Sequence, residues 1–107
     1  MTVVATHLTF ITGWNVVQLR HLVRACRALP RPLAVVGDLN LEGSAPQRIT
    51  GWRSVGRVDT FPVEVPDRQI DHVLLDGPVE PSSEPVAVDT GMSDHRALVV
   101  DLALRGR

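Results

Sequence analysis

The segment Leu33-Ala34-Val35-Val36-Gly37-Asp38-Leu39-Asn40 runs from a continuous apolar stretch directly into polar residues. A continuous apolar stretch of this length is typical of a strand at the centre of a sheet that is covered on both faces. Asp38 and Asn40 follow where the strand ends. The sequence therefore predicts a buried strand over residues 33–37, with a carboxylate and an amide at its carboxyl end.

Other elements are predicted on both sides of this strand. Residues 3–8 are rich in β-branched side chains and predict another buried strand. Apolar residues recur at helical spacing from Val16 to Cys26, with Asn15 as the expected N-cap and Pro30 as the end of the helix. Downstream, the sequence predicts a short helix over residues 44–50, a turn over residues 77–85, and strands over residues 52–55, 69–75, 86–88 and 96–104.

The order of these elements indicates the fold class. Strands that alternate with one long helix predict an α/β (α+β) protein, in which a mixed sheet carries helices on one face. The 107 residues leave room for one domain. No stretch approaches the roughly 18 apolar residues that span a bilayer, and the first residues lack the pattern of a signal peptide. We therefore expect a cytoplasmic location.

Charge and cysteine content exclude some classes of function. All 11 basic residues are arginines, set against 12 acidic residues, and they form no basic run that would indicate general nucleic-acid binding. The near-neutral balance still allows a phosphorylated substrate, because a metal ion can supply positive charge locally. The single cysteine, Cys26, excludes an intrachain disulfide and a thiolate metal cluster, and its place on the predicted helix favours a small buried side chain.

Polar clusters stand where the predicted strands end or the turns begin. They are Thr6-His7, Gly37-Asp38-Leu39-Asn40, Gln69-Ile70-Asp71-His72 and Ser93-Asp94-His95-Arg96. Sites in α/β sheets gather at strand ends, because the sheet fixes the geometry and the loops carry the reactive groups. The four clusters are therefore candidates for one site.

Each cluster also has a purely structural interpretation. Residues 38–40 fit an Asx turn, His7 fits a hydrogen-bonded core histidine, and residues 93–95 fit a helix or strand cap. An adjacent carboxylate is, however, also the means by which a protein fixes an imidazole tautomer for proton transfer. Asp71 differs, because it interrupts an apolar run, where even an uncharged polar group without a partner costs roughly 2–7 kcal/mol. Asp71 must therefore have a partner, structural or catalytic.

Taken together, the clusters match the groups that hydrolyse a phosphoester. The groups that count here are two histidines, three carboxylates and an amide: His7, His95, Asp38, Asp71, Asp94 and Asn40. A Mg²⁺-type ion takes hard oxygen ligands and polarises a phosphoryl group. A base then activates water, and neutral donors stabilise the charge that develops.

The same residues resemble the C-terminal half of the endonuclease/exonuclease/phosphatase (DNase I-like) family. The resemblance rests on ordered motifs that cover nearly the whole chain: Thr6-His7-Leu8, Gly37-Asp38-Leu39-Asn40, Thr60-Phe61-Pro62, Gln69-Ile70-Asp71-His72-Val73-Leu74 and Ser93-Asp94-His95-Arg96-Ala97. It implies a Mg²⁺- or Mn²⁺-dependent phosphodiesterase or endonuclease-type hydrolase, whose substrate is a phosphoester and can be a nucleic acid.

The resemblance also implies roles for individual residues. His95 is the expected general base, or otherwise the histidine that contacts the phosphate, with Asp94 orienting it. Asp38 and Asn40 are expected to position the nucleophile and the scissile phosphate. Together with Asp94 they are the expected metal ligands.

Three further roles follow from the resemblance. Asp71 is expected to pair with a histidine or to hold a second metal ion. His7 is expected to contact the phosphate or to protonate the leaving group. His72 stands where an aromatic residue is common in the family, and we expect it to be no ligand.

The sequence departs from the family in one large respect. Members are about twice as long, and the Asn and metal-binding Glu of their first half have no counterpart here. We therefore expect residues 1–107 to form the C-terminal portion of such a domain, half of a four-layer sandwich of two sheets. The face left open would bind a partner or a second copy. Two alternatives remain: a catalytically inactive remnant or split half that folds against a partner, and an unrelated α/β binding domain.

Overall fold

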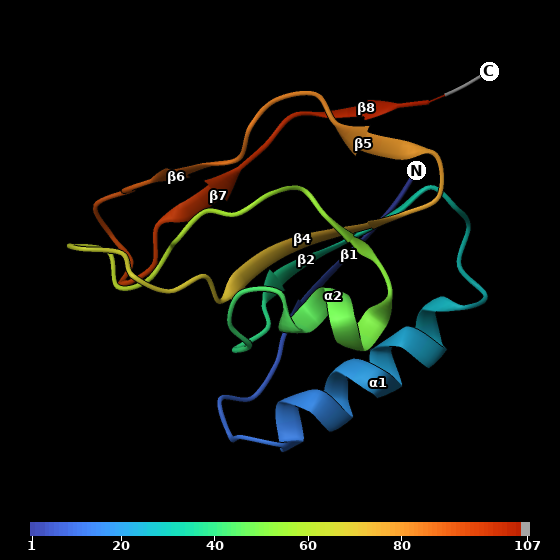
Figure 1. The fold of residues 1–107 in the computed structure, drawn as a ribbon, viewed down its shortest axis with the longest axis horizontal. Helices are drawn as coiled ribbons and strands as arrows, with labels where there is room; N and C mark the ends of the chain where they lie inside the picture. Colours follow the sequence, from blue (N-terminus) through green and yellow to red (C-terminus); the bar gives the residue numbers. More distant parts are fainter. Residues whose placement is uncertain (106–107) are drawn as a thin grey trace.

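A four-stranded mixed sheet forms the centre of the structure, a computed structural model that describes residues 1–105. In spatial order the strands are β1 (Thr2–His7), β2 (Leu33–Asp38), β4 (Asp71–Asp76) and β3 (Arg53–Ser54). β1 runs parallel to β2, and the other two pairs are antiparallel. Helices α1 (Trp14–Cys26) and α2 (Ala45–Thr50) lie on one face of the sheet, as Figure 1 shows. The predicted α/β architecture is confirmed.

Strand register assigns every side chain of the sheet to one of two faces. Val4, Val35 and Leu74 are aligned across β1, β2 and β4, and all three belong to the core beneath the helices. Ala34 and Leu75, one position along, belong to a second core on the opposite face. Both faces of β2 are therefore covered, which explains the continuous apolar run over residues 33–37.

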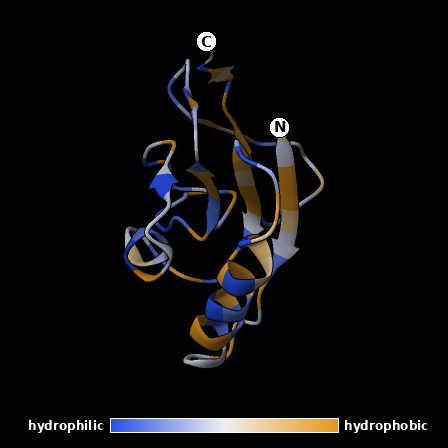
Figure 2. Ribbon diagram, turned by 90° about the vertical axis from the view of Figure 1, so that its right-hand side faces the viewer, coloured by the Kyte–Doolittle hydropathy of each residue, from blue (hydrophilic) through white to orange (hydrophobic). Residues whose placement is uncertain are grey.

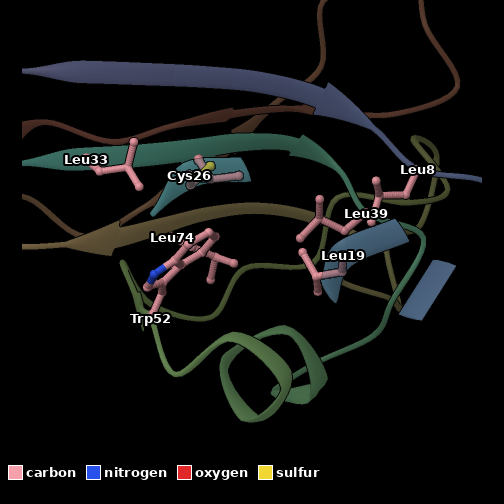
Figure 3. Packing of buried hydrophobic residues seen from close by; sticks show 8 residues of the cluster. Leu8, Leu19, Cys26, Leu33, Leu39, Trp52 and Leu74 are labelled. Atoms are coloured by element: carbon pink, nitrogen blue, oxygen red, sulfur yellow. The ribbon is translucent and has the colours of Figure 1, made fainter. Parts of the chain in front are cut away.

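Helix α1 supplies the largest part of the helix-side core. Leu19 and Cys26 are buried there against Leu33 and Leu74, and Trp52 closes the cluster from the segment that follows α2 (Figure 3). Burial raises the pKa of the Cys26 thiol more than the nearby Arg31 charge lowers it. The interpretation of Cys26 as a small buried side chain is confirmed.

The start of α1 differs from the prediction. Gly13 occupies the N-cap position and Asn15 lies inside the first turn, because the N–H groups of Trp14 and Asn15 both donate to the Ile11 carbonyl. The side chain of Asn15 instead donates to the carbonyl of Asn40, 3.0 Å away. The prediction of Asn15 as the N-cap is therefore wrong, and this side chain ties the helix to the turn after β2.

The end of the chain also differs from the prediction. The expected single strand over residues 96–104 is two strands, β7 (Ala97–Val99) and β8 (Leu102–Leu104). β7 pairs with β6 (Val86–Val88), and β8 pairs with β5 (Val79–Pro81), which lies inside the expected turn over residues 77–85. These four strands form an irregular ribbon over the second face of the sheet (Figure 1).

The break in this ribbon is a change of register between its two halves. After the pair Pro81 and Leu102, the next pair is Val86 and Val99, so residues 82–85 lie opposite residues 100–101. The Ser82 N–H donates to the Asp101 carbonyl, and the Asp101 N–H donates to the Ser83 hydroxyl. An apolar run alone does not reveal this break.

Several large apolar side chains remain exposed on the ribbon and on β1. They are Met1, Val3, Val86, Val88, Val99 and Leu104. Figure 2 shows apolar residues along the strand that begins at the N-terminus, which lies at the edge of the sheet. Within residues 1–105, no helix is long and apolar enough to cross a membrane.

Gly37 pairs with Thr6, one position before the polar residues at the ends of β1 and β2, and the close approach of the two backbones there requires glycine. Its φ is 145°, and a Cβ atom at this position would lie 1.8 Å from the carbonyl oxygen of Thr6.

We predict that Gly37→Ala lowers the free energy of unfolding by about 3 kcal/mol, because backbone rather than a flexible side chain must move. Gly51→Ala is the control: Gly51 has a φ of 76° but no heavy atom within 4 Å of the added Cβ, so it should cost only about 1 kcal/mol. Urea unfolding measures both, and equal losses would contradict the steric role of Thr6.

Candidate functional site

Three polar side chains form a row across one end of the sheet. His7, Asp38 and Asp71 are aligned across β1, β2 and β4 in the observed register. The parallel strands β1 and β2 both end here, and the antiparallel β4 begins here. Aligned residues share a face, so all three side chains lie on the face opposite the helices. Clusters far apart in the sequence are thus brought together by strand pairing alone.

The fourth group, His95, is delivered by a loop. The segment over residues 94–96 runs beside residues 60–63, where the Arg96 N–H donates to the Thr60 carbonyl (2.7 Å) and the Val63 N–H donates to the Asp94 carbonyl (2.9 Å). The Phe61 ring packs against the His95 imidazole, with ring centroids 4.8 Å apart. These contacts hold the imidazole over the row of sheet residues.

His95 connects the two carboxylates of the row. Its Nδ1 lies 2.7 Å from Asp71 Oδ2, and its Nε2 lies 3.6 Å from Asp38 Oδ2. Because a carboxylate oxygen accepts, the short contact requires the proton on Nδ1. In neutral His95 the Nε2 lone pair therefore points toward Asp38 and is free to accept a proton.

The surrounding charges favour the protonated form of His95. Burial alone lowers the pKa of the imidazole, but the hydrogen bond to Asp71 and the charges of Asp71, Asp38 and Asp94 outweigh it and raise the pKa above its usual value. A more basic imidazole is a better proton acceptor at Nε2.

Thr60 holds the carboxylate on which His95 depends. Its hydroxyl donates to Asp71 Oδ2 at 2.6 Å, and the residue is fully buried. Asp71 thus has the partners that its position in an apolar run demanded. The sequence included Thr60 in a motif but gave it no role; a buried hydroxyl near a carboxylate is visible only once the loop is placed.

Asn40 shapes the turn after β2. Its backbone N–H donates to Asp38 Oδ1 at 2.9 Å, which is the Asx-type turn that the sequence allowed, and its φ is 51°. Its side-chain Nδ2 donates to the Leu8 carbonyl at 2.8 Å. Asn40 therefore links the ends of β1 and β2 and orients Asp38.

The remaining predicted residues lie around this centre. His7 Nε2 is 3.5 Å from Asp38 Oδ2, and its side chain is 74% exposed, so it is not a core histidine. Asp94 is exposed beside His95. His72 is buried on the helix side, where its Nε2 donates to the Leu41 carbonyl at 2.7 Å. Burial lowers the pKa of His72, which this hydrogen bond only partly offsets.

The residues gathered here fit a divalent cation. One ligand atom each from Asp38, Asp71 and His95 lies within 4.8 Å of the others. Within residues 1–105, the ion pairs of Asp38 and Asp71 involve only histidines, with no arginine among them. Two half-buried carboxylates without a fixed positive partner favour a bound cation. The group shares Asp38 with the predicted ligand set, and Asp94 does not belong to it.

Comparison with known proteins supports the fold. No protein-family model matches the chain, and no curated protein matches it. A mannosyl-6-phosphatase of Bacteroides thetaiotaomicron VPI-5482 has a similar structure, with a TM-score of 0.61 and 14% sequence identity. The similarity covers 94% of this chain and 50% of the other, so the chain spans half the length of that neighbour. At this identity the likeness is one of fold.

The hydrogen bond to Asp71 makes a pH-dependent prediction. Asp71→Asn should lower the pKa of His95, which NMR titration of the imidazole measures, while Asp94→Asn should lower it less. A raised native pKa stabilises the fold below the unfolded value of about 6.5, and that contribution is lost as the pH rises through the native pKa. Stability near pH 5 should therefore fall in Asp71→Asn more than stability near pH 9. Equal shifts in the two variants would contradict the assigned contact.

Proposed function

We propose that this chain carries the base-bearing half of a metal-dependent phosphoester hydrolase of the endonuclease/exonuclease/phosphatase kind. The observation that carries the proposal is the linked set Asp71, His95 and Asp38. In this set one carboxylate fixes the imidazole at Nδ1 while Nε2 faces the other carboxylate. A phosphatase with a similar fold adds support at the level of reaction class.

His95 is the proposed general base. Its Nε2 removes a proton from a water molecule that contacts both the imidazole and Asp38, and the water attacks phosphorus in line with the leaving oxygen. Asp71 keeps the proton on Nδ1 and stabilises the imidazolium that forms. Thr60 keeps the Asp71 carboxylate in place for both tasks.

The other polar groups have supporting roles. His7 is exposed at the rim of the site, where it can contact the phosphate or protonate the leaving group. Asn40 holds the turn that orients Asp38, and Asp94 adds negative charge beside His95. Mg²⁺ or Mn²⁺ held by Asp38 and Asp71 would polarise the phosphoryl group and offset its charge.

A model phosphodiester tests the proposed reaction. We expect Mg²⁺- or Mn²⁺-dependent hydrolysis of bis(p-nitrophenyl) phosphate, with a loss of about 10²–10⁴-fold in kcat for His95→Ala, the usual contribution of a general base. His21→Ala is the matched control, because His21 is an exposed histidine on α1 outside the site. Equal rates for the wild-type chain and His95→Ala would rule out the assigned base.

The alternative is an inactive half that is completed by a partner. The exposed apolar side chains of the ribbon and β1, and the half-length match to the neighbour, favour it. A thermal melt separates the two: Mg²⁺ bound to the native site must raise the midpoint. We expect a rise that Asp38→Asn abolishes, whereas an unchanged midpoint in the wild-type chain would favour the inactive half.

A further inference from the structure

The sheet ends at β1 on one side and at the two-residue strand β3 on the other, so β1 is its long open edge. The N–H groups of Thr2 and Leu8 donate to the carbonyls of Pro32 and Asp38, at 2.9 Å each. Because alternate residues of a strand direct their backbone groups to the same side, the even-numbered residues of β1 face β2. The N–H and C=O groups of Val3, Ala5 and His7 therefore point outward, and β1 has no partner strand on that side within residues 1–105.

This edge lacks the features that keep sheet edges apart. Folded proteins protect an edge strand with charged side chains, proline or a bulge. β1 reads Thr-Val-Val-Ala-Thr-His, with no arginine, acidic residue or proline, and it pairs with β2 in uninterrupted register. An uncharged strand of six residues with a free edge is suited to bind another strand.

Next to β1, each face of the sheet has a surface that the side chains of an added strand could contact. On the helix side, a groove of about 390 Å³ separates the end of β1 from α1, and Gln18, His21, Leu22 and Ala25 form its helix wall. On the other side, Val3 is 62% exposed and Ala5 is exposed next to it. A strand that pairs with β1 would place alternate side chains in the groove and over Val3.

We propose that the open edge of β1 binds an extended polypeptide strand that residues 1–105 do not supply, uncharged and with apolar side chains at alternate positions. The length of the structural neighbour supports this occupant, because half of that chain has no counterpart here. A foreign strand also extends the sheet on the side of His7, next to the site. The inference does not depend on the proposed hydrolysis.

Supplying a strand in cis tests the edge directly. A six-residue strand of alternating Val and Thr is joined to Met1 through Asn-Gly, a two-residue hairpin turn. This spacing places the odd-numbered residues of β1 in hydrogen-bonded pairs with the added strand. A control extension carries proline at the positions whose N–H groups would bond β1. Amide hydrogen exchange, read residue by residue, is the measurement.

We expect the added strand to slow exchange of the Val3, Ala5 and His7 amides by at least about tenfold. The Val4 and Thr6 amides already face β2 and serve as internal controls. The proline-bearing extension should leave all five amides as in the unextended chain. Unchanged exchange at Val3 and Ala5 with the added strand would overturn the proposal.

A second copy of the chain is the competing occupant. Protection of the odd-numbered amides in the unextended chain, rising with protein concentration and accompanied by a dimer in sedimentation equilibrium, would show that β1 pairs with itself. That result would also overturn the proposal that β1 binds a strand from outside residues 1–105 other than a second copy of β1.

Discussion

The antiparallel register between β2 and β4 is the constraint on which the site depends. It aligns Asp38 with Asp71 on the face opposite the helices, 33 positions apart along the chain. A slip by one residue would turn Asp71 toward the helices and expose the buried His72 instead. His72 and Asp71 resist that slip, because they would lose the Leu41 carbonyl and the Thr60 hydroxyl as partners. These polar contacts of β4 therefore help to set the distance between the two carboxylates.

The loop that carries His95 depends on the same register. Once Asp71 is in place, its Oδ2 accepts from both Thr60 and His95, which ties two loops to the sheet. The Phe61 ring then packs on the imidazole. Removal of the Asp71 carboxylate would therefore free the His95 imidazole and leave the buried Thr60 hydroxyl without an acceptor.

The sequence predicted the elements that depend on local pattern. The strand β2, the helix α1 and the strand around Asp71 could all be predicted, because burial imposes a pattern of apolar residues on each of these segments. The break between β7 and β8 and the first turn of α1 were predicted wrongly. Both are set by contacts between distant segments: Ser82 and Ser83 bond Asp101, and Asn15 bonds Asn40. The candidate residues were named from the sequence, but only the strand register and the placement of two loops show that Asp38, Asp71 and His95 form one group and that Thr60 supports it.

Binding of Mn²⁺, followed by the EPR signal of the free ion, tests the central claim that Asp38 and Asp71, which strand register aligns, form a cation site beside His95. The account predicts saturable binding to the wild-type chain, lost in Asp71→Ala and retained in Asp94→Asn, since Asp94 lies outside the group. Binding that survives Asp71→Ala, or no saturable binding by the wild-type chain, would contradict it.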